Sequence, residues 1–168
     1  MHELYAKLAM GLVALAAAAP PRAGSDGVTV ALPPGWHATK PDQGRITQPL
    51  TRLVVSSGPI HPRLTGACHS QVADYTFPTS AVAIVVVEWT QPIGGMHIGS
   101  GPARPKRFTP ANLRIYRPEA IECFDGPGGL VQLAERGHSF AAYVLLGRKA
   151  PPTAAARAVL DTLRLARR

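Results

Sequence analysis

The chain has 168 residues, a length that fits one domain with at most a short tail. Apolar residues make up 46% of it and charged residues 17%, which excludes wholesale disorder. No apolar run reaches the roughly 18 residues of a membrane span, which excludes a polytopic membrane protein. The 17 Pro and 16 Gly exceed the usual share, so we expect little helix. Two cysteines are too few for a disulfide-dense mini-fold or a four-cysteine zinc site.

The start of the chain has the features of a secretion signal. Residues 1–7 include one lysine, and residues 8–19 form an uncharged apolar stretch that ends in small residues. We therefore expect a signal peptide at 1–19, a linker at 20–26 and a single domain at 27–168, secreted or in the cell envelope. A retained N-terminal membrane anchor, or a helix packed on the domain, is the alternative.

Strands dominate the predicted elements. Residues 81–89 are rich in β-branched residues and apolar on both faces, which predicts a central strand. Residues 113–116 lie between prolines, which predicts an edge strand. Period-2 or continuous apolar patterns predict strands at residues 28–32, 50–56, 81–89, 113–116, 130–135 and 139–146.

The last predicted element is a helix at residues 153–163. Thr153 can cap it, and its apolar residues recur on one face. We therefore expect an α+β fold, in which this C-terminal helix packs on one face of an antiparallel β-sheet. A β-sandwich is the alternative.

Cys68 and Cys123 are the two cysteines. In the oxidising compartment that the signal predicts, an even pair usually bonds, so we expect a disulfide between them. The chain-entropy model gives such a bond about 4 kcal/mol of stabilisation. The alternatives are a reactive thiol and metal ligation by Cys68, His69 and Cys123, which no short C-x-x-C knuckle supports.

Residues 91–111 form a Gly/Pro-rich basic loop between strands. Arg104, Lys106 and Arg107 lie beside Phe108 in this loop, and together they are the candidate binding residues. Because an exported protein rarely meets nucleic acid, we expect none as a partner; anionic lipid or cell-wall polymer suits the charge better. The alternative is a solvated surface loop whose arginines reflect coding bias.

Catalytic motifs are missing from the sequence. It has no P-loop, no G-x-S-x-G elbow and no H-E-x-x-H, and Ser100 lies only in a fragment of an elbow. We therefore assign no catalytic residue, no metal ligand and no cofactor. Beyond the predicted signal peptide, which contains His2, the histidines are scattered singly, at positions 37, 61, 69, 97 and 138.

Two carboxylates end apolar strands. Glu88 lies on the same strand face as Val86, and Glu135 lies on the same face as Leu133. Two carboxylates at one sheet edge could act as acid and base on a sugar. Pairing with arginine is the commoner use of such groups, so we expect each carboxylate to have an arginine partner.

Several short motifs resemble small exported proteins of high-GC bacteria that have no assigned activity. The motifs are at residues 32–37, 87–89, 122–124, 146–148 and 158–163. The P-x-G-W motif at 33–36 and the closing helix are also similar to the PsbP-like fold of extrinsic photosystem subunits. That resemblance implies an antiparallel sheet flanked by helices and a role in binding or assembly, and neither resemblance implies a catalytic residue.

Together these features favour a non-enzymatic binding or cell-envelope-associated domain. One alternative is a small secreted hydrolase that uses Glu88, Glu135 or a histidine. The other is an anionic-surface binder that acts through residues 104–107.

Overall fold

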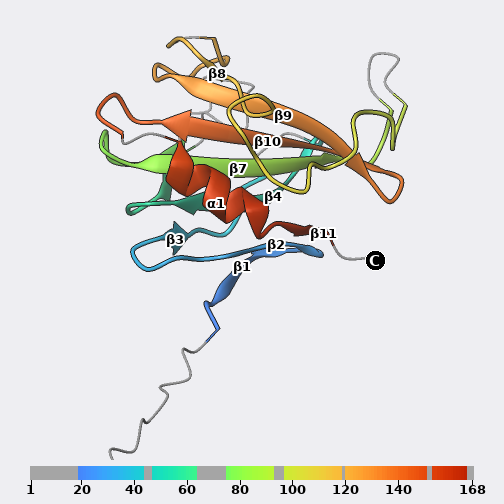
Figure 1. Ribbon diagram of the computed structural model, residues 1–168, viewed down its shortest axis with the longest axis horizontal. Coiled ribbons are helices and arrows are strands. Elements are labelled where there is room, and N and C mark those ends of the chain that lie inside the picture. Colours follow the sequence, from blue (N-terminus) through green and yellow to red (C-terminus); the bar gives the residue numbers. More distant parts are fainter. Residues whose placement is uncertain are drawn as a thin grey trace, which may run out of the picture.

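The protein is mostly β, and the expected α+β class is wrong. In the computed structural model (Figure 1), 42% of the described residues are strand and 6% are helix, in three antiparallel sheets and one short C-terminal helix. Gly and Pro are frequent in the sequence, and one stretch of the described chain is an α-helix, of eight residues. The structure describes residues 19–43, 47–63, 75–92, 97–118, 120–150 and 153–165.

The largest sheet has six strands in the order β3-β4-β7-β10-β9-β8, all paired antiparallel. As the sequence predicts, β7 is an interior strand and β8 is an edge strand. The strands are β3 (His37–Ala38), β4 (Leu50–Ser56), β7 (Val82–Trp89), β8 (Ile115–Tyr116), β9 (Gly128–Glu135) and β10 (His138–Leu146).

Two smaller sheets complete the fold. One has the order β1-β2-β11, and the other pairs β5 with β6. Their strands are β1 (Arg22–Ser25), β2 (Val28–Ala31), β5 (His61–Pro62), β6 (Tyr75–Thr76) and β11 (Arg164–Leu165).

Strand β1 occupies residues that we expected to be a linker. Asp26 and Gly27 have positive φ angles of 50° and 81°, the backbone of the tight turn that joins two-residue hairpins. This turn folds β1 back on β2, so that Ser25 pairs with Val28. Strand pairing therefore begins at Arg22, ahead of the domain start expected at residue 27.

Helix α1 (Ala154–Asp161) lies across one face of the six-stranded sheet (Figure 1). Its buried residues share one apolar cluster with Val82, Ile84 and Val86 of β7. Thr153 precedes the helix but makes no side-chain cap hydrogen bond, contrary to the prediction. Its φ and ψ of −63° and 1° are near-helical, whereas a capping residue is normally extended.

The opposite face of the large sheet is buried as well. Ala83, Val85 and Val87 of β7 belong to a second apolar cluster, which loop residues such as Ile60 and Ile121 help to form. Because β7 has apolar neighbours on both faces, its continuous apolar sequence is explained by burial on both sides.

The β9–β10 hairpin brings several charged residues to one end of the sheet. Its turn is Arg136 and Gly137, with φ angles of 56° and 81°, and Glu135 pairs with His138 across it. Two residues further along β10, Phe140 pairs with Glu88 of β7. Glu88, Glu135 and His138 therefore lie near the same end of the sheet.

None of the helices in the described part is long and apolar enough to span a membrane. The predicted signal peptide falls almost wholly on residues 1–18, which lie outside the described residues.

Candidate functional site

A buried ion pair joins two neighbouring interior strands of the sheet, β4 and β7. The Nε atom of Arg52 lies 2.6 Å from Oε2 of Glu88, whose residue is 2% exposed. The Nη1 atom of Arg52 lies 2.6 Å from Oδ2 of Asp26, in the turn between β1 and β2. The predicted arginine partner of Glu88 is thus present. Two short charge-assisted bonds hold the guanidinium between two carboxylates.

Strand irregularity places Arg52 in this position. The pairing of β4 with β7 shifts register between Thr51 and Leu53, so Arg52 is the extra residue of a bulge. Arg52 was not among the candidate residues. A single cation inside a largely apolar strand could have pointed to it, because a buried charge needs a partner.

His138 extends the cluster toward solvent. Its Nδ1 lies 2.7 Å from Oε1 of Glu88, and its side chain is 42% exposed. Both carboxylate oxygens of Glu88 are therefore engaged by protein groups. Among the described residues, no hydroxyl or thiol hydrogen-bonds to His138.

The second candidate carboxylate is paired as well. Oε2 of Glu135 accepts a 2.9 Å hydrogen bond from Nε of Arg104, and Oε1 lies 3.9 Å from Nε of Arg136. Arg104, one of the candidate binding residues, is therefore half-buried and bound to a carboxylate of its own chain. Each of the two candidate carboxylates is thus held by an arginine, as expected.

Phe108 is a core residue and not part of a binding surface. It is 4% exposed, and its backbone N–H donates to Oδ1 of Asp161 at 2.6 Å. The aromatic ring next to the basic residues thus anchors the loop to the domain. Arg107 and Lys106, one and two residues earlier, remain exposed.

Among the described residues, the Ser100 hydroxyl bonds to no histidine side chain. The Ser100 hydroxyl donates to the backbone carbonyl of His97, and Ser139 Oγ accepts the Gly99 N–H at 2.9 Å. Within the described ranges, His, Cys, Asp and Glu residues form no group of three or more that could hold a metal ion.

An open groove runs along the β8 edge of the large sheet, and we call it the edge groove. Its volume is about 400 Å³. A smaller hollow of about 180 Å³ shares Pro102 and Gln132 with it and continues toward Trp89. The edge groove is lined by Pro102, Ala103, Pro105, Asn112, Tyr116, Leu130, Val131 and Gln132.

The loop wall of the edge groove is fixed to strand β9. Ala103 forms a parallel bridge with Ala134, and the Ala134 N–H donates to the Pro102 carbonyl at 2.7 Å. Pro102 and Pro105 restrict the backbone further, because proline fixes its own φ angle. The groove is thus largely pre-formed.

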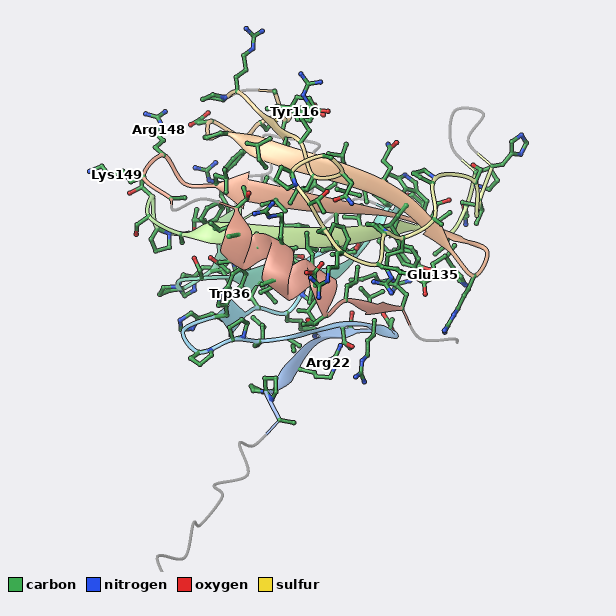
Figure 2. All side chains as sticks on the ribbon, in the orientation of Figure 1. Arg22, Trp36, Tyr116, Glu135, Arg148 and Lys149 are labelled. Atoms are coloured by element: carbon green, nitrogen blue, oxygen red, sulfur yellow. The ribbon has the colours of Figure 1, made fainter. Side chains whose placement is uncertain are left out.

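Tyr116 is the exposed large apolar residue among the described residues that line the edge groove. It is 43% exposed, and Figure 2 shows it at the β8 edge of the molecule. The Arg114 guanidinium lies 5.7 Å from the centre of its ring, a cation–π contact that holds the ring in place. The residues that line the groove include no carboxylate.

The predicted disulfide is only partly within the described residues. Cys123 is disulfide-bonded, whereas Cys68 lies outside the described residues. The pairing of Cys68 with Cys123 therefore stays a prediction.

No family model, no curated protein and no solved structure matches this chain. The resemblances to small exported proteins and to the PsbP-like fold therefore stay predictions.

Proposed function

We propose that this chain is a non-enzymatic binding domain of the cell envelope, and that the edge groove binds an acidic polysaccharide. The observation that supports this proposal best is the composition of the groove. An exposed aromatic ring and two amide side chains line it, and the described lining has no carboxylate. Two exposed cations, Lys106 and Arg107, follow the lining residue Pro105 in the chain.

Each of these groups suits one part of an acidic sugar. The face of Tyr116 is a flat apolar surface on which a sugar ring can stack. The amides of Asn112 and Gln132 can donate to and accept from hydroxyl groups. Lys106 and Arg107 follow directly on Pro105 of the groove wall, so they supply positive charge for the acid groups.

The shape of the site favours a polymer chain over a membrane surface. The edge groove is an open channel with a fixed loop wall, and the adjoining hollow extends it toward Trp89. A membrane surface is flat and usually accepts several exposed apolar side chains. Here Tyr116 is the one exposed large apolar side chain among the described residues.

The paired carboxylates support a binding role over catalysis. Glu88 and Glu135, the two acidic candidates, are bound to Arg52 and Arg104. Placement in the envelope rests on the apolar stretch at residues 8–19.

Affinity electrophoresis and calorimetric titration against polygalacturonate test the proposal. Binding of the acidic polymer should be saturable, and the neutral polymer pullulan should bind much more weakly. Lys106→Ala should weaken binding about fivefold, which corresponds to roughly 1 kcal/mol for one nearby charge. Tyr116→Ala should weaken it at least as much, because the stacking surface is lost.

Lys40→Ala is the matched control, because Lys40 is an exposed cation beside β3, at the edge of the sheet opposite to β8. It should leave binding unchanged. An equal loss in the Lys40 and Lys106 variants would show that only net charge attracts the polymer. Binding to anionic vesicles without binding to polygalacturonate would replace the polysaccharide by a lipid surface.

A further inference from the structure

A second pocket lies at one end of the large sheet, and we call it the end pocket. It has a volume of about 330 Å³, which is within the size range of ligand sites. Figure 2 shows Arg148 of this pocket at the end of the molecule away from Glu135 and the β9–β10 hairpin turn. The end pocket is lined by Arg63, Tyr75, Thr76, Phe77, Thr79, Cys123, Phe124, Asp125, Gly126, Leu146, Gly147 and Arg148.

Backbone hydrogen bonds fix the walls of the end pocket. The Gly147 N–H donates to the Ala81 carbonyl at 2.9 Å, and the Lys149 N–H donates to the Thr79 carbonyl at 2.8 Å. Gly147 has no room for a side chain, because an added Cβ would lie 2.2 Å from the Thr79 carbonyl oxygen. A pocket with such fixed walls orders little on binding, which favours affinity.

The apolar part of the end pocket is aromatic. The rings of Phe77 and Phe124 stack with their centres 6.0 Å apart and an interplanar angle of 23°. Both side chains are half-buried, so part of each ring is open to the pocket. Tyr75 is buried at the same site, and its hydroxyl accepts the Asp42 N–H at 3.0 Å. This wall suits a planar apolar group.

The polar part of the end pocket is mainly cationic. Arg63 and Arg148 are exposed, and neither forms an ion pair with a carboxylate of the described residues. Asp125 is the one carboxylate among the described lining residues, which include two arginines. Guanidinium groups bind carboxylate, phosphate and sulfonate groups through paired N–H donors.

We infer that the end pocket is a second binding site, which takes a small organic anion with a planar aromatic body. The aromatic wall holds the body of the ligand, and Arg148 and Arg63 bind its acid group. The end pocket shares no lining residue with the edge groove, so this inference does not depend on the proposed polysaccharide.

Fluorescence titration with 8-anilinonaphthalene-1-sulfonate tests the inference on the folded, oxidised protein. The dye should bind saturably with a rise in emission, and Arg148→Ala should weaken it about tenfold, the effect of losing one bond to a charged group. The neutral dye N-phenyl-1-naphthylamine should bind the wild type and this variant with equal affinity.

Lys149→Ala is the matched control, because Lys149 is an exposed cation next to Arg148 that does not line the pocket. It should bind the anionic dye as the wild type does. Tyr116→Ala and added polygalacturonate should also leave dye binding unchanged, which separates this site from the edge groove. Absence of saturable binding, or equal losses in the Arg148 and Lys149 variants, would overturn the inference.

Discussion

The Nε atom of Arg52 lies 2.6 Å from Oε2 of Glu88, and the two side chains are only 7% and 3% exposed. Both charges have therefore lost nearly all of their water. A buried charge that has lost its partner is costly, so each side chain depends on the other. The same carboxylate also holds His138, and the same guanidinium holds Asp26. The pair thus ties β4 and β7 to the β1–β2 turn and to β10.

Replacement of Glu88 should therefore destabilise the fold. Glu88→Gln removes the charge but keeps the shape, and it should lower the free energy of unfolding by about 3 kcal/mol, because the Arg52 charge stays buried. Urea denaturation followed by circular dichroism measures this. The double variant Arg52→Met/Glu88→Gln should lose clearly less than the sum of the two single variants. Additive losses would show that the two side chains do not interact energetically.

The basic loop should become more mobile near Phe108 when Asp161 is replaced. Asp161 accepts the Phe108 N–H at 2.6 Å, which fixes Phe108 in the core beside the exposed Lys106 and Arg107. Asp161→Ala should leave that N–H without a partner, so trypsin should cut after Lys106 and Arg107 several-fold faster. Mass spectrometry of timed digests identifies the cuts. Unchanged cutting at these two sites, with the remaining sites as internal reference, would contradict the anchoring role.

Local patterns in the sequence predicted the large sheet well. Residues 50–56, 81–89 and 139–146 were predicted as strands, and they correspond to β4, β7 and β10. Their apolar periodicity and β-branched composition are local properties. Short strands such as β5 and β11 have two residues each, so they contain no period to detect.

Long-range pairing explains most of what the sequence did not predict. Arg52 meets Glu88 because of a bulge in β4, and His138 meets it because of the β10 register. Neither relationship has a local signature. Phe108 was assigned to a binding cluster because its neighbours are basic, but the direction of an aromatic ring depends on the core that is available to it.

Cys68 and Cys123 are predicted to form a disulfide. Cys123 is disulfide-bonded, and Cys68 is the other cysteine of the sequence. Thiol titration of the unfolded, unreduced protein should find no free thiol, and a peptide digest should contain residues 68 and 123 in one cross-linked fragment. A Cys68→Ser/Cys123→Ser variant should be less stable by about 2–5 kcal/mol. One or two free thiols in the native protein would contradict the bond.

Tyr143 should make the protein less stable at alkaline pH. Burial raises the pKa of its phenol above the usual value, and the negative charge of Glu122 raises it further. Well below a pH of about 10, the phenol is protonated in both the folded and the unfolded chain, so its contribution to the free energy of unfolding is fully present. As the pH rises past that value, the unfolded chain releases the proton first. Unfolding is then coupled to proton loss, and the free energy of unfolding falls until the folded phenol ionises too.

Tyr143→Phe should remove this coupling. The free energy of unfolding of the variant should fall less steeply than that of the wild type between a pH of about 9 and about 11. Urea denaturation at a series of pH values measures both slopes. Glu122→Gln should give an intermediate slope, because it removes the second cause of the raised pKa and leaves burial, the larger cause, in place. Identical slopes for the wild type and Tyr143→Phe would show that the phenol keeps its ordinary pKa in the fold.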